Sequence, residues 1–92
     1  MTPDEFNDLQ ARIFRGDLVR ARIIAGISRG EVARSIGATN RAIRNFEEGA
    51  WDPRLSFLRR YALAIGVVIQ YDVRSVSDQT PGRHAAPEGD PR

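Results

Sequence analysis

The chain has 92 residues with 14 arginines, no lysine and 12 acidic residues, so its net charge is +2. A chain of this size supports one small domain, which excludes a two-domain enzyme. The absence of cysteine excludes a disulfide framework, a thiolate nucleophile and cysteine-ligated zinc, so the fold must depend on apolar packing. The longest apolar stretch, 61–69, is less than half of the about 20 residues that a membrane span needs. We therefore expect a cytoplasmic protein with no membrane segment.

The charge is distributed unevenly along the chain. Residues 1–17 carry 2 arginines and 4 acidic residues, 18–74 carry 10 and 5, and 75–92 carry 2 and 3. The positive excess therefore lies in the middle of the chain, where periodic apolar residues indicate a fold. Such an excess favours a polyanionic partner, such as nucleic acid.

The first residues have the form of a helix start. Thr2 suits the N-cap, Pro3 the first helical position, and Glu5 the third position of a capping box. We expect an extra N-terminal helix within residues 1–16. Gly16 and Asp17 then permit a break and a second helix, which would end at Gly26.

Residues 17–66 are expected to form the main domain. Ser28 can cap a helix that ends at Gly37, and Thr39 can cap another that ends before Gly49. A last helix follows Pro53 and ends at Gly66, and its apolar residues form one stripe. Together with the two N-terminal segments, these predict an all-α fold with five helices.

The apolar period changes to two after Gly66, which predicts an added C-terminal β-strand over 67–76. No second strand is evident, so the strand pairs with its twin in a homodimer, pairs with another protein, or is an extended tail. The residues of its expected dimerisation face are Val67, Ile69, Tyr71 and Val73. Residues 77–92 are polar and rich in proline, which predicts a disordered tail.

One spacing in the main domain suggests a function. Ala33, Gly37, Ile43 and Phe46 supply a small residue, a turn glycine and two core residues at the intervals that a helix-turn-helix requires. Two short helices that cross steeply need the small residue where their backbones approach. The alternative is an arbitrary helical hairpin, since these residue types are common.

The surrounding residues make a specific resemblance. They are Arg22 to Gly26, Ile27 to Ala33, Ile36 to Thr39, Ile43, Phe46 to Gly49, Pro53, Leu55, Leu58, Ala62 and Ile65 to Val67. Together they resemble the Cro and phage-repressor helix-turn-helix family, also called the XRE family, over residues 18–67. The resemblance implies a lambda-repressor-like domain, with a positioning helix at 29–36 and a recognition helix at 39–48 that enters the major groove of double-stranded DNA.

The outer face of the expected recognition helix carries side chains that can contact bases. They are Asn40, Arg41, Arg44 and Asn45. Arginine can bind guanine and asparagine can bind adenine through two hydrogen bonds. The alternative is a solvated helix face, but two arginines and two asparagines without an acidic residue are unusual for simple solvation.

Other residues are expected to hold the DNA backbone. Helix N-termini at Ser28 and Thr39 present backbone amides that suit phosphate oxygens. By the resemblance, Arg29 replaces a glutamine that contacts phosphate, and Arg54 occupies another phosphate-contacting position. Either arginine could instead be surface charge. The resemblance also implies a structural salt bridge between Arg22 and Glu47.

The sequence therefore predicts a sequence-specific DNA-binding transcriptional regulator associated with the nucleoid, most simply a homodimeric repressor of a pseudo-palindromic operator. The C-terminal strand also resembles that of HipB-type antitoxins, so the alternative is an antitoxin that neutralises a toxin partner and autoregulates its operon. A helix-turn-helix that serves only protein contacts is a further alternative. We expect no cofactor and no metal, and the sequence offers no constellation of catalytic residues.

Overall fold

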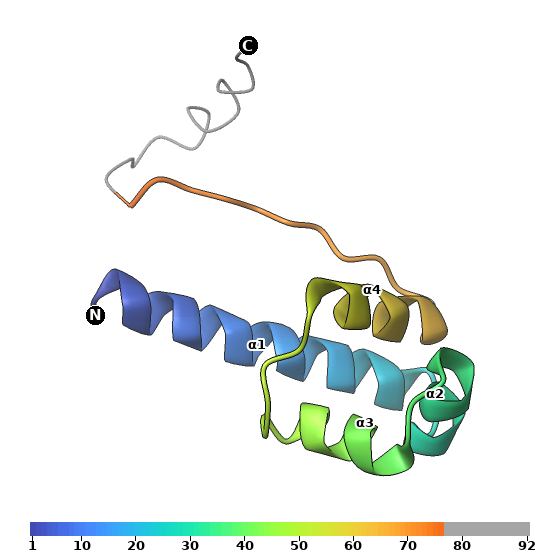
Figure 1. Ribbon diagram of the computed structural model, residues 1–92. Helices are drawn as coiled ribbons and strands as arrows, with labels where there is room; N and C mark the ends of the chain where they lie inside the picture. The colour runs from blue at the N-terminus through green and yellow to red at the C-terminus, as the bar shows by residue number, and fades with distance from the viewer. Residues whose placement is uncertain (77–92) are drawn as a thin grey trace.

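The computed structural model describes residues 1–76, which form four α-helices joined by short loops (Figure 1). The helices are α1 (Pro3–Ile24), α2 (Arg29–Ile36), α3 (Asn40–Glu47) and α4 (Leu55–Ala64). The all-α prediction is confirmed for this part of the chain. The predicted disordered tail, 77–92, lies outside the described residues. None of the described helices is long and apolar enough to cross a membrane.

The start of α1 follows the sequence, but the break predicted after it is wrong. The Thr2 hydroxyl accepts a hydrogen bond from the Glu5 amide at 3.1 Å, and the Glu5 carboxylate accepts one from the Thr2 amide at 2.8 Å. The helix then continues through Gly16 and Asp17, so four helices replace the five expected. A glycine inside a helix opposes it by only about 1 kcal/mol, which packing of the following turns outweighs. Asp17 pairs with Arg20 at 2.9 Å along the same helix instead of capping a new one.

The caps predicted at Ser28 and Thr39 are both present. The Ser28 hydroxyl accepts from the Glu31 amide at 3.1 Å, and the Thr39 hydroxyl accepts from the Ala42 amide at 3.0 Å. Between the two helices Gly37 has a φ of +73°, which ends α2 in the left-handed conformation that glycine adopts without strain. α2 and α3 pack against each other, and in Figure 1 they cross steeply.

The core lies between the second half of α1 and the three shorter helices. Its buried apolar side chains are Leu18, Val32, Ala33, Ile43, Phe46, Tyr61, Ala62 and Ile65. Phe46 is at the centre, because its ring meets those of Phe57 and Tyr61 edge-on at centroid distances of 5.1 and 5.0 Å. The first half of α1 projects away from this body (Figure 1).

The predicted C-terminal strand is absent from the described residues. The chain after α4 is extended, but it has no neighbouring strand with which to form a ladder. The expected dimerisation face is also divided. Val67 and Ile69 pack against the core of their own chain, whereas Tyr71 and Val73 are exposed. Strand alternation alone could not reveal this division, since it reports a period and not the surface that each residue meets.

Candidate nucleic-acid interface

The two sides of α3 have different surroundings. Ile43 and Phe46 are almost completely buried, and they attach the helix to the core. Asn40, Arg41 and Arg44 are exposed on the other side, and no described residue forms a hydrogen bond or ion pair with their side chains. Three of the four residues predicted to face outward are therefore exposed, whereas the fourth, Asn45, is half-buried.

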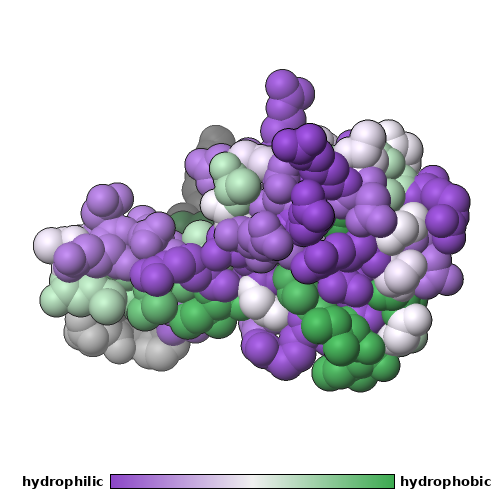
Figure 2. Space-filling model, turned by 90° about the horizontal axis from the view of Figure 1, so that it is seen from below, coloured by the Kyte–Doolittle hydropathy of each residue, from purple (hydrophilic) through white to green (hydrophobic). Residues whose placement is uncertain are grey.

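A shallow hollow lies between the start of α2 and the outer side of α3. Its lining consists of Arg22, Ser28, Arg29, Gly30, Asn40, Arg41 and Arg44. Five of the eight residues predicted to contact DNA meet here, and no carboxylate is part of the lining. Figure 2 looks onto the side of the molecule where α3 lies and shows a largely hydrophilic surface there.

The other three predicted contact residues lie outside this hollow. Thr39 caps α3 through its hydroxyl. Arg54 is the exposed N-cap residue of α4, and its side chain makes no capping hydrogen bond. Asn45 belongs to α3 but does not line the hollow. The structure therefore separates one compact group of candidate contacts from three outlying ones.

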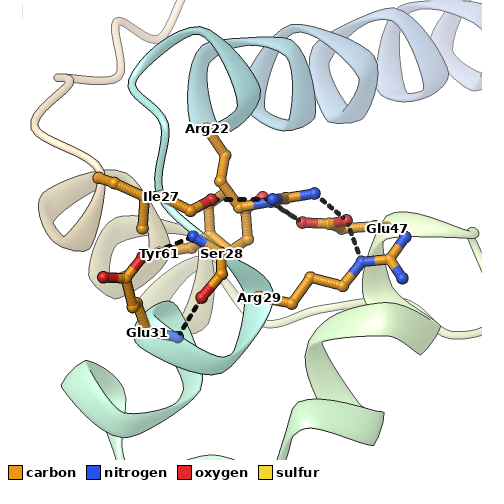
Figure 3. A network of polar contacts seen from close by, with 7 residues as sticks. All are labelled: Arg22, Ile27, Ser28, Arg29, Glu31, Glu47 and Tyr61. Carbon is orange, nitrogen blue, oxygen red and sulfur yellow. Dashed lines mark hydrogen bonds and ion pairs between the residues drawn. The ribbon is translucent and has the colours of Figure 1, made fainter.

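A buried carboxylate, that of Glu47, pairs with two of the arginines that line the hollow (Figure 3). The Glu47 side chain is only 2% exposed, and both its oxygens accept hydrogen bonds from Arg22, from Nε at 2.6 Å and from Nη2 at 3.0 Å. Arg22 also donates from Nη1 to the Ile27 carbonyl at 2.9 Å. The pairing that the resemblance implies is thus a bidentate ion pair that joins α1 to the end of α3.

Two further groups bind the same carboxylate, and sequence reasoning did not predict them. Arg29 donates from Nε to Glu47 Oε1 at 2.8 Å, and the Tyr61 hydroxyl donates to Oε2 at 2.6 Å. Donors from α1, α2 and α4 therefore converge on one anion of α3. A phenol within the apolar stripe of α4 was the available signal, because a buried tyrosine hydroxyl requires a hydrogen-bond partner.

The contacts of Arg29 change the role that the sequence suggested. Its Nε is committed to Glu47, yet the side chain is 38% exposed and lines the hollow. The guanidinium has five N–H donors, so Nη1 and Nη2 can still serve a ligand. Arg29 is thus a cation held in position by an internal anion, rather than a mobile surface charge.

Ionisation of Glu47 depends on these donors. Burial raises the pKa of its carboxyl group, but the hydrogen bonds from Arg22, Tyr61 and Arg29 outweigh burial and hold the pKa below its ordinary value. The hydrogen bond to Glu47 in turn raises the pKa of Arg22. Burial, followed by the hydrogen bond to Glu47, raises the pKa of Tyr61, so its hydroxyl remains a donor. The cluster carries two positive charges and one negative charge.

Gly30 lies in the first turn of α2, at the edge of the hollow. A Cβ added there would make only ordinary contacts, 3.6 Å from Arg34 Nη1 and 3.7 Å from Asn40 Nδ2. Its φ is not positive, so neither backbone conformation nor crowding requires a glycine. What glycine provides is open space beside Asn40, next to first-turn amides that a helix leaves without intrahelical partners.

No group of three or more histidine, cysteine, aspartate or glutamate side chains in residues 1–76 is arranged to hold a metal ion. The interface candidate thus consists of guanidinium, amide and hydroxyl donors over one buried carboxylate. Comparisons with family models, with curated proteins and with solved structures found no match for this chain.

Proposed function

We propose that this protein is a sequence-specific DNA-binding transcriptional regulator of the XRE type, which acts as a homodimeric repressor. The observation that carries the proposal is the hollow between α2 and α3, which four arginines line and no carboxylate lines. The N-terminus of α2 opens onto it through Ser28 and Gly30. Backbone amides and the positive end of a helix favour phosphate oxygens.

The cations of the hollow fall into two groups with different suitability for DNA. Arg29 is held by Glu47 but its side chain remains 38% exposed, so it supplies a fixed cation for the DNA backbone. Arg22 is buried and donates from all three guanidinium nitrogens to Glu47 and Ile27, so it supports this arrangement from inside. Arg41 and Arg44 extend from the exposed side of α3 without a partner among the described residues. Unpaired arginine side chains on a helix can adjust to guanine edges in the major groove. This division assigns backbone contact to Arg29, structural support to Arg22, and base recognition to Arg41 and Arg44.

The short, capped α3 suits insertion into the major groove. Its inner side is anchored by Ile43, Phe46 and Glu47, so the outer residues are presented on a rigid element. Asn40 stands in the first turn beside the hollow, where recognition helices make their base contacts. Thr39 and Arg54 stay proposed phosphate contacts at the two edges of this surface, and Asn45 a proposed base contact.

A repressor of this type requires two copies, because two-fold symmetry in the protein matches an inverted repeat in the operator. Two recognition helices about 34 Å apart would reach successive major grooves on one side of the duplex. Occupation of such a site would block access to a promoter. No cofactor is needed for this activity.

In vitro selection from randomised duplex DNA by the purified protein tests the proposal. We expect enrichment of an inverted repeat whose half-sites are about one helical turn apart. We also expect binding to weaken steeply as salt is raised, because arginine contacts with phosphate release counterions. Failure to enrich any sequence at low salt would contradict the proposed function.

A further inference from the structure

α1 has a second apolar face that the body of the protein does not cover. Phe6, Ile13, Ile23 and Ile24 are 52%, 46%, 61% and 80% exposed. Leu9 precedes the buried Leu18 by nine residues, and Ile13 precedes the buried Arg22 by nine. Nine residues at 100° each amount to two and a half turns, so these residues lie on opposite sides of the helix. A helix that is apolar on two sides requires a second packing partner.

This outer face is long and regularly spaced. Residues at alternating intervals of three and four lie along one seam of a helix. The outer face has this spacing at Phe6, Leu9, Ile13, Gly16 and Ile23, and Arg20 occupies the one intervening position. The seam from Phe6 to Ile24 extends about 27 Å at 1.5 Å per residue. Figure 2 shows apolar side chains along the projecting part of α1, which is at the left in both views.

Gly16 is the feature of this face that its own chain does not explain. Its φ is not positive, and nothing lies within 4 Å of a Cβ added to it. Glycine inside a helix opposes folding by about 1 kcal/mol relative to alanine. Its physical advantage is that another backbone can approach closely. Gly16 is half-buried and lies between the exposed Ile13 and Ile23, so it is suited to the crossing point of a second helix.

We propose that two copies of this chain associate through α1, with the two helices antiparallel and crossing at Gly16. Leu9 and Ile23 each lie seven residues from Gly16, on either side of it. In an antiparallel pair centred on Gly16, Leu9 of each copy therefore opposes Ile23 of the other. A surface that is self-complementary in this way is what a two-fold interface requires.

The charge distribution favours the same arrangement. Residues 1–17 carry two more acidic residues than arginines, whereas 18–74 carry five more arginines than acidic residues. Antiparallel pairing directs the acidic start of each α1 toward the basic part of the other copy, while parallel pairing would direct the two acidic starts toward each other. Arg12 and Arg20 oppose each other in this register, and each has an acidic partner on its own helix, Asp8 and Asp17. The proposal rests on the proposed function only in that a dimeric regulator needs a surface that joins its copies.

Analytical ultracentrifugation of the full chain and two variants tests the pairing. We expect the wild type to dimerise and Ile13→Glu to raise the dimer dissociation constant at least about tenfold, because the interface would bury an unpaired charge. Asn7→Glu makes a similar change on another side of α1 and should leave the constant unchanged. Circular dichroism checks that both variants remain helical.

A monomeric wild type would overturn the proposal, and so would an Ile13→Glu variant that dimerises as well as wild type. Equal weakening by Asn7→Glu would also overturn it, because the effect would then be charge repulsion. None of the substituted residues lines the hollow between α2 and α3. A wild type that is monomeric yet enriches a single half-site would therefore overturn the pairing and the homodimer, while DNA recognition at the hollow would stand.

Cysteine crosslinking tests the register. The chain contains no cysteine, so introduced thiols form the only possible disulfides. Leu9→Cys combined with Ile23→Cys should give covalent dimers on mild oxidation, whereas Asn7→Cys with Ile23→Cys should not. Equal crosslinking of the two variants, or none in the first, would overturn the antiparallel register.

Discussion

The inner and outer sides of α3 use charge in opposite ways. On the inner side, the Glu47 side chain is almost fully buried and accepts hydrogen bonds from Arg22, Arg29 and Tyr61. On the outer side, Arg41 and Arg44 are exposed and have no partner in the described part of the chain. The inner charges hold the helices together, and the outer charges are available to a ligand. One eight-residue helix thus has internally paired charges on one side and exposed charges without a described partner on the other.

The difference also shows why arginine content is a poor guide to function by itself. A guanidinium that is paired with a buried carboxylate contributes orientation, and its removal leaves an anion without partners. An exposed guanidinium contributes little to stability, because water screens its interactions. The predictions that follow depend on this contrast between the two sides of α3.

Removal of the buried anion should have the largest effect. Glu47→Ala leaves the Arg22 guanidinium buried without its partner, and we expect a loss of about 3–5 kcal/mol in the free energy of unfolding. Urea denaturation followed by circular dichroism measures this loss. Glu48→Ala, which removes an exposed carboxylate from the next position, is the matched control and should change stability by less than about 0.5 kcal/mol. Similar losses of unfolding free energy in Glu47→Ala and Glu48→Ala would contradict the special structural role of the buried carboxylate.

Removal of an outer cation should reverse this pattern. Arg41→Ala should leave the free energy of unfolding nearly unchanged and weaken binding to the selected DNA site by about 1–3 kcal/mol, with relaxed preference at one base position. Arg59→Ala, an exposed arginine of α4 outside the hollow, is the control for loss of charge. Equal losses on specific and random DNA would show that Arg41 contacts phosphate instead of a base.

Arg29 should behave as an intermediate case. Arg29→Ala removes a donor from Glu47 and a cation from the hollow, so both stability and DNA affinity should fall. The loss of affinity should be similar for all sequences, because the proposed contact is with phosphate. Parallel measurements of unfolding and of binding to selected and random DNA check this. A loss of stability alone would make Arg29 a purely structural residue, and a loss of DNA affinity alone would make it a purely DNA-contacting one; either result would contradict the intermediate role.

Lowering the pH should weaken the inner side selectively. The pKa of Glu47 in the folded protein lies below its ordinary value, so its stabilising effect is present above about pH 4.3 and is lost as the pH falls through the folded pKa. Protonation retains part of the hydrogen bonding, so the loss should be smaller than in Glu47→Ala. Unfolding measured between pH 6 and pH 3 should show a flatter pH profile for Glu47→Gln than for wild type. Identical profiles would refute this assignment.

The smallest effect is expected at the edge of the hollow. Gly30→Ala should stabilise the protein by about 0.5–1 kcal/mol, because the added methyl group meets only ordinary contacts and the unfolded chain loses freedom. Gly37→Ala should instead destabilise it, since Gly37 has a positive φ. Thermal unfolding of the two variants measures both signs. Destabilisation by Gly30→Ala would show that the start of α2 does not tolerate a side chain.

The sequence predicts the local features of this fold well. Capping residues such as Ser28 and the turn glycine Gly37 act through neighbours within a few positions, so their patterns specify the helix ends. The break at Gly16 was wrong because glycine only permits a helix to end, and distant packing determines whether it does. The strand prediction for 67–76 was wrong for a related reason, because alternation of apolar residues does not supply a pairing partner.

The candidate site was predictable only in part. Arg41 and Arg44 could be placed on the outer side of α3 because helical periodicity determines direction. The contacts of Glu47 with Arg29 and Tyr61 join residues 18 and 14 positions apart, and no local pattern encodes such distances. The side-chain network that supports the interface thus required the structure.

The aromatic cluster around Phe46 gives the chain a natural optical reporter. Trp51 is the only tryptophan, and its ring centroid lies 6.0 Å from that of Phe46 in α3 and 5.1 Å from that of Phe57 in α4. It is 37% exposed, so its emission is sensitive both to these rings and to solvent. Any ligand or substitution that loosens α3 from α4 should therefore shift the intrinsic fluorescence, which allows α3 docking to be followed in real time without a label.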